Sequence, residues 1–135
     1  MRSCSGHKEK LEKIPALDWS TGALDDGLRC YRAGQFFEAH EYWETVWLKA
    51  AEPDKAFLQG LIQMTAAFHH WRRGNLEGTA SLLRQALQKL ERFEDETGQA
   101  MVAPLRGEIR KWLEGIATAE ASELRFPEIR VRNGA

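Results

Sequence analysis

The chain lacks any apolar run near the roughly 18 residues that a membrane-spanning helix needs. Its first eight residues are polar and no apolar stretch follows them, so we expect no secretory signal peptide. Cysteine is scarce, because Cys4 and Cys30 are the only two, and they form neither a disulfide framework nor a CxxC motif. Unpaired thiols suit a reducing compartment. These absences predict a cytoplasmic protein that does not contact membranes.

An excess of charge of one sign is also missing. The 19 basic and 20 acidic side chains leave a formal net charge of -1. Domains built to hold nucleic acid usually show a clear basic excess, so this balance argues against a nucleic-acid partner. The 135 residues, of which 43% are hydrophobic, suffice for one domain with a real core. The sequence leaves open whether the chain forms a homo-oligomer.

The pattern of apolar residues predicts an all-α fold. Apolar positions recur at helical spacing, and no strand-like alternation is long enough to build a sheet. Ser20 or Thr21 caps the first helix and Gly34 ends it, Asn75 caps the fourth, and Pro104 suits the first turn of the fifth. The five helices are expected at about 20–34, 35–50, 54–73, 75–97 and from 104 onward.

Short connections predict that neighbouring helices pack antiparallel in a compact bundle. Residues 1–19 lack periodicity and are interpreted as an N-terminal arm. Residues 20–121 form the helical domain. Residues 122–135 are expected to be an extended tail that docks on the bundle.

The second helix carries polar residues among its aromatic ones. At about 100° per residue, Trp43, Glu44 and Trp47 fall within about 60° of His40, whereas Glu41 lies on the flank. This places His40 and Glu44 in the middle of the apolar face. A buried histidine and carboxylate cost several kcal/mol unless they are paired, and their i, i+4 spacing allows that pairing.

The third helix is apolar nearly all round, which is typical of a central helix. One stripe of it carries Gln59, Gln63 and His70 among small residues. We expect this stripe to meet the face with His40 and Glu44, and His69 to point elsewhere.

Three interpretations of this pocket stay open. The first is a divalent metal site with His40, Glu44 and His70 as ligands and Glu41 as the base that activates water. Gln59, Gln63, Trp43 and Trp47 would line it. The second is metal-free acid–base chemistry by His40 and Glu44. The third is a buried hydrogen-bond network that fixes the register of the helices.

Two motifs resemble the DUF309 family of small prokaryotic helical proteins. They are Phe36-Phe37-Glu38-Ala39-His40-Glu41 with Glu44 and Trp47, and Phe57-Leu58-Gln59-Gly60-Leu61-Ile62-Gln63 with Arg72-Arg73-Gly74-Asn75. The resemblance covers about 20–93. It implies the helical fold and a bacterial or archaeal cytosol. Some classifications label the family a predicted metal-dependent hydrolase, which favours the metal interpretation of His40, Glu41 and Glu44. The alternative is a non-enzymatic helical scaffold or small-ligand-binding domain.

Overall fold

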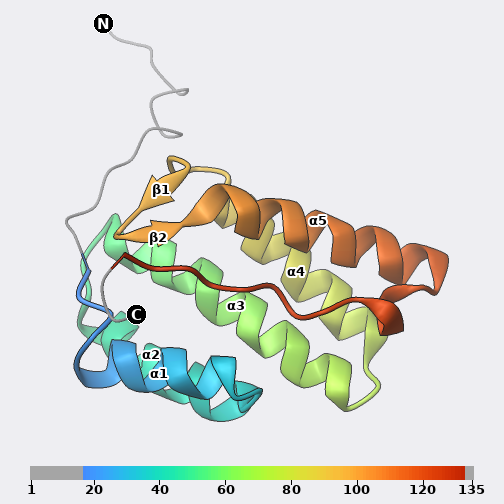
Figure 1. Cartoon of the computed structure of the whole chain (residues 1–135), viewed down its shortest axis with the longest axis horizontal. Helices are drawn as coiled ribbons and strands as arrows, with labels where there is room; N and C mark the ends of the chain where they lie inside the picture. The colour runs from blue at the N-terminus through green and yellow to red at the C-terminus, as the bar shows by residue number, and fades with distance from the viewer. Residues whose placement is uncertain (1–16, 133–135) are drawn as a thin grey trace, which may run out of the picture.

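Five α-helices make up most of the computed structural model, which describes residues 17–132 (Figure 1). Their bounds are α1 Gly22–Arg32, α2 Phe36–Lys49, α3 Asp54–Arg72, α4 Leu76–Leu90 and α5 Val102–Thr118. Two short strands, β1 Glu96–Thr97 and β2 Ala100–Met101, precede α5, and a 3-10 turn, η2 Ala121–Glu123, follows it. Consecutive helices run in opposite directions, so the predicted all-α antiparallel bundle is confirmed (Figure 1).

The helices begin and end close to the capping and glycine residues that the sequence analysis identified. Gly34 and Gly74 have φ of +79° and +80°, a left-handed conformation that glycine adopts without strain, just after α1 and α3 end. The Asn75 side chain accepts a 2.9 Å hydrogen bond from the Gly78 amide, which confirms it as the cap of α4. Thr21 precedes α1, but its side chain makes no capping bond.

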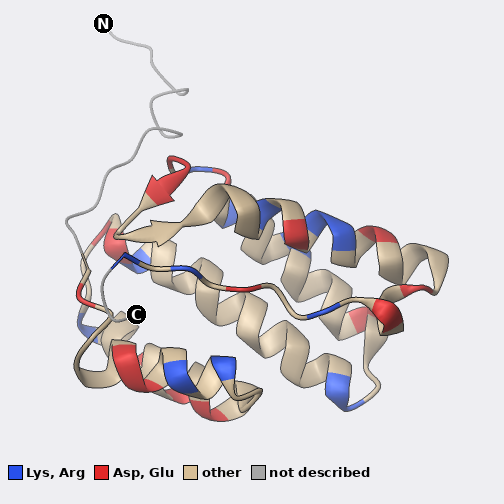
Figure 2. Ribbon diagram, viewed as in Figure 1, with Lys and Arg blue, Asp and Glu red and all other residues tan. Residues whose placement is uncertain are grey.

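Helix α3 is the centre of the bundle. It packs against both α2 and α4, and its charged residues stand only at its two ends (Figure 2). Phe57, Leu61, Met64 and Phe68 are fully buried along it. No helix within residues 17–132 is long and apolar enough to cross a membrane.

The tail crosses α3 between α1 and α5 (Figure 1). Its carbonyl groups accept hydrogen bonds from three side chains of the bundle: the Tyr31 hydroxyl donates to Pro127, Arg32 to Ile129 and Trp112 to Arg125. The side chain of Ile129, which belongs to the tail, is buried in the core. The predicted docking of an extended tail is therefore confirmed.

The strands were not predicted. Strands β1 and β2 pair antiparallel around a turn at Gly98 and Gln99, where both residues have positive φ. The tail joins this hairpin through a bridge between Ala100 and Val131. Trp19, the last residue of the predicted arm, is fully buried, and its indole nitrogen donates a 2.8 Å hydrogen bond to the Gly98 carbonyl. The rest of that arm, 1–16, lies outside the described residues.

Candidate functional site

The inner side of α2 differs from the expected one. Phe36, Ala39 and Trp43 are the buried residues of this helix. The His40 side chain lies beside that row and is 26% exposed, and the Glu44 side chain is 49% exposed. The prediction that both occupy the middle of the apolar face is therefore wrong. The centre of the buried face lies at Ala39, which is fully buried, and His40 lies at the edge of that face.

His40 and Glu44 still form a pair. The Nε2 atom of His40 lies 3.8 Å from an Oε atom of Glu44, which is within ion-pair distance but too long for a hydrogen bond. The Nδ1 atom of His40 is shielded from solvent and has no hydrogen-bond partner in the structure. The pair is thus a partly exposed ion pair with one unsatisfied ring nitrogen, and not a closed buried network.

The polar stripe of α3 does not converge on this pair. The Gln63 amide donates a 3.0 Å hydrogen bond to Gln85, so Gln63 faces α4. His70 lies 3.3 Å from the Asn75 side chain. His69 contacts α2 instead, with its ring centroid 5.4 Å from that of Phe37. The expectation that His70 faces α2 and His69 points elsewhere is reversed, because the α2–α3 contact is rotated by about one residue.

The remaining candidates occupy different environments. Trp43 is fully buried between α1 and α2, where its indole donates a 3.1 Å hydrogen bond to the Leu24 carbonyl. Trp47 is partly buried and holds the Lys55 ammonium 4.5 Å from its ring centroid. Gln59 is partly buried and Glu41 is exposed. Trp43 therefore belongs to the core, and the others lie at or near the surface.

The donor set does not complete a metal site. Within residues 17–132, no three His, Cys, Asp or Glu side chains come together in a group that could hold an ion. His40 and Glu44 supply two donors on one helix, whereas protein metal sites with an open position use three protein ligands. His70 is engaged with Asn75. The residues present therefore do not fit the ligand set predicted from the sequence.

The outer side of α2 is the feature that the sequence analysis missed. Phe37, Tyr42 and Leu48 are 48%, 41% and 65% exposed, and they are three of the four large exposed hydrophobic residues among those described. Three exposed glutamates, Glu38, Glu41 and Glu44, stand among them. A signal was available: no Lys or Arg occurs between residues 36 and 48, and the apolar residues of this segment are too many for one stripe.

We call this set the outer α2 face: Phe37, Glu38, Glu41, Tyr42, Glu44 and Leu48. It combines exposed apolar side chains with three negatively charged carboxylates. Aromatic rings and carboxylates both attract cations. The face can therefore recognise a surface that carries basic and apolar side chains together.

These observations define a small helical-bundle protein with a docked tail and an exposed acidic and apolar helix face. Comparison with known proteins places it more closely. The family model described as Domain of unknown function (DUF309) matches residues 24–82, which confirms the resemblance seen in the sequence motifs. The matched segment contains all of α2 and α3, most of α1 and the first half of α4, and so it includes the whole outer α2 face.

A longer protein contains a similar sequence. An uncharacterized protein of Aquifex aeolicus (strain VF5) is 32% identical over 107 residues, which cover 78% of this chain. The same alignment covers 31% of that relative, so the chain spans about a third of its length.

Proposed function

We propose that this protein is a non-enzymatic helical interaction module that binds a basic segment of a partner protein on the outer α2 face. The observation that carries the proposal is the exposure of Phe37, Tyr42 and Leu48 on a helix whose outer side has carboxylates and no basic residue before Lys49. At about 100° per residue, Leu48, Glu41 and Glu44 lie within about 40° of Phe37. Exposed apolar and acidic side chains therefore share one stripe of the helix, and Tyr42 lies on its flank. Exposed apolar residues on one stripe can form an interaction surface. We expect this binding to take place in the cytoplasm.

The chemistry of the face selects the partner. Lys and Arg side chains of the partner would pair with Glu38, Glu41 and Glu44, and they would also contact the exposed rings of Phe37 and Tyr42. Apolar residues of the same segment would cover Leu48. An acidic partner would be repelled, so charge supplies the specificity and apolar burial supplies most of the affinity.

The test is a fluorescence-anisotropy titration with two labelled amphipathic peptides of the same length, one with Lys and Leu and the other with Glu and Leu. The Lys peptide should bind and the Glu peptide should not. The triple variant Glu38→Gln, Glu41→Gln, Glu44→Gln should bind the Lys peptide roughly tenfold more weakly, since three exposed ion pairs at about 0.5 kcal/mol each add to about 1.5 kcal/mol.

The matched control removes three exposed glutamates elsewhere, with Glu114→Gln, Glu120→Gln and Glu123→Gln near the end of α5. It should bind as the wild type does. Equal weakening in both triple variants would reduce the effect to net charge and reject the outer α2 face. A chain that dimerises through Phe37 and Leu48 in light scattering would make a second copy the occupant, and the proposal of a basic partner would then fail.

Metal-dependent hydrolysis stays a second prediction, with His40 and Glu44 as ligands and Glu41 as the base. The observation in its favour is the i, i+4 pair at 3.8 Å, and the two-donor set weighs against it. Metal content and thermal stability of the wild type and of His40→Ala should be measured with added zinc, manganese or magnesium. If the wild type carries no metal and gains no stability from any of these ions, the hydrolase prediction is rejected.

A further inference from the structure

A second surface feature lies where the tail passes the helix ends. A pocket of about 480 Å³ opens between the end of α1, the start of α2, the end of α3 and the tail. Its lining includes Arg32, Phe36, Arg72, Phe126, Pro127 and Ile129. Pockets of 300–1,000 Å³ are the usual size for small-molecule sites. Two guanidinium groups in one such pocket give it a distinct chemistry.

Arg72 is held in place by its surroundings. Its guanidinium carbon lies 4.7 Å from the ring centroid of Phe36 and 5.2 Å from that of Phe126. Its Nη1 group donates a hydrogen bond to the Gly34 carbonyl. Gly34 makes this approach possible, because a Cβ atom there would lie 2.9 Å from Nη2 of Arg72. The guanidinium plane is therefore fixed before any ligand arrives.

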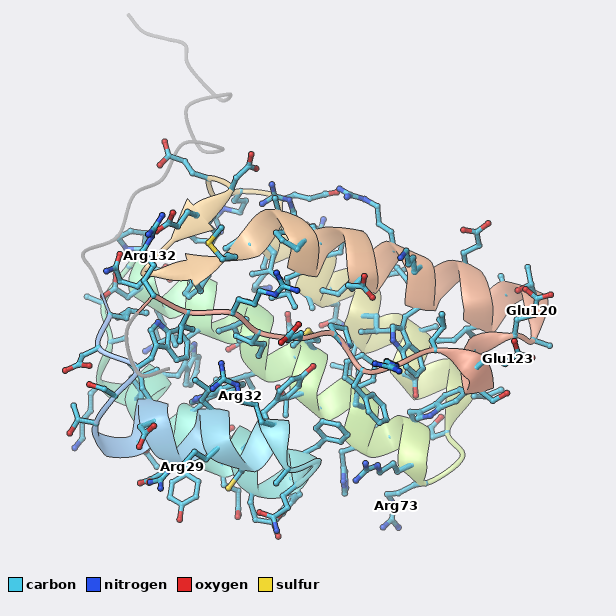
Figure 3. All side chains as sticks on the ribbon, viewed as in Figure 1. Arg29, Arg32, Arg73, Glu120, Glu123 and Arg132 are labelled. Carbon is cyan, nitrogen blue, oxygen red and sulfur yellow. The ribbon has the colours of Figure 1, made fainter. Side chains whose placement is uncertain are left out.

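Arg32 reaches the same pocket from α1. Figure 3 shows its side chain directed toward the tail, whereas Arg29, one turn earlier, points away from the tail. Its Nη2 group donates a 2.9 Å hydrogen bond to the Ile129 carbonyl. A guanidinium has five N–H donors, so a single carbonyl contact leaves donor capacity at each of the two arginines.

The two positive charges have no carboxylate of their own. Among residues 17–132, the Arg–carboxylate ion pairs that the structure shows are formed by other arginines. Neither Arg32 nor Arg72 forms one within this range. Glu128, the one acid in the lining, lies 3.2 Å from Arg130. The pocket therefore has a net positive charge beside apolar walls.

We propose that this pocket binds a small phosphorylated molecule, with its phosphate between Arg32 and Arg72 and its organic part against the walls formed by Phe126 and the tail. A phosphate monoester carries close to two negative charges at neutral pH, which matches two guanidinium groups. Planar guanidinium groups bind such oxygens in bidentate fashion, and they do so more readily than an ammonium group does. The proposal is independent of the outer α2 face, because it uses none of that face's residues.

The experiment titrates the full chain with inorganic phosphate at constant ionic strength and follows backbone amide NMR shifts. Saturable shifts are expected around residues 31–36, 72 and 126–129. Arg32→Gln and Arg72→Gln should each weaken phosphate binding roughly tenfold or more, since each removes charge-assisted hydrogen bonds. The matched controls are Arg29→Gln, on the same helix as Arg32, and Arg73→Gln, next in sequence to Arg72. Both should bind phosphate as the wild type does.

Several outcomes would overturn the proposal. One is the absence of saturable shifts in the wild type. Another is equal weakening in Arg29→Gln and Arg32→Gln, which would indicate nonspecific attraction. Acetate that binds as tightly as phosphate would assign the pocket to carboxylates and reject a phosphorylated ligand. If Arg72→Gln fails to fold, the comparison of Arg32→Gln with Arg29→Gln decides the matter alone, because both change one arginine of α1.

Discussion

The inner and outer sides of α2 use similar residues in different ways. On the inner side Trp43 is fully buried, its indole nitrogen is hydrogen bonded, and its ring lies close to those of Trp19 and Tyr31. On the outer side Phe37 and Leu48 remain 48% and 65% exposed, although one side of the Phe37 ring contacts His69 of α3. The inner aromatic residues therefore stabilise the fold, whereas the outer ones are available to a partner.

Trp43→Ala should have the largest effect on the free energy of unfolding. A fully buried tryptophan replaced by alanine leaves a cavity and loses its transfer energy, which together cost about 3–5 kcal/mol. Denaturant melts followed by circular dichroism measure the loss. Gly27 packs against this indole so closely that a Cβ atom there would lie 2.3 Å from Nε1 of Trp43, so Gly27→Ala should also destabilise the protein. Full stability in either variant would contradict the packing of α1 on α2.

Tyr31→Phe should lower stability by about 1–2 kcal/mol, because it leaves the Pro127 carbonyl without its 2.6 Å hydrogen bond. Burial also raises the pKa of the Tyr31 phenol. The folded protein therefore keeps that proton when unfolded tyrosines, with a pKa of about 10, have lost it. The resulting stability is present below about pH 10 and is lost as the pH rises above it. Melts from pH 8 to pH 11 should show a smaller alkaline loss for Tyr31→Phe than for the wild type.

Glu44→Ala should change stability by less than about 1 kcal/mol, because exposed ion pairs contribute little and the Glu44 side chain is 49% exposed. The change should shrink further in 1 M salt, where charges are screened. A loss of several kcal/mol that salt does not alter would show that Glu44 is more deeply buried than this geometry allows.

Leu48→Ala should have the smallest effect on stability, below about 0.5 kcal/mol, since this exposed side chain loses little contact when it is truncated. Phe37→Ala should cost about 1 kcal/mol, because half of its ring is covered and it contacts His40 and His69. The same two variants should weaken binding of the basic amphipathic peptide. A variant that melts like the wild type and binds the peptide poorly would show that the outer side of α2 serves binding, whereas the inner side serves stability. Unchanged peptide binding in both variants would remove the apolar part of the proposed interface.

Helix positions could be predicted from local sequence, but the rotation of α2 could not. Gly34, Gly74 and Asn75 act through their own backbone or side chain, so their effect on helix ends is local and visible in the sequence. The direction in which His40 points depends on α1 and α3, which both pack on α2. Apolar residues on two sides of one helix leave that rotation undetermined in a single sequence.

The β1–β2 hairpin and the pocket could not be predicted from the sequence for a different reason. Strands β1 and β2 have two residues each, too short for any alternation. The pocket joins Arg32 and Arg72 with Phe126, and only the docked tail brings these three together. Long-range contacts of this kind leave no periodic trace in the sequence.

Trp19 and Arg132 meet the same turn of the hairpin: the Trp19 indole bonds to the Gly98 carbonyl, and the Arg132 amide bonds to the Gln99 carbonyl at 2.9 Å. The first and last parts of the described chain are therefore anchored side by side. Because these two points lie close together, the domain can be inserted into a host protein through two adjacent linkers without distortion of its core. It should equally tolerate a circular permutation that joins these two points and opens the chain at an exposed loop.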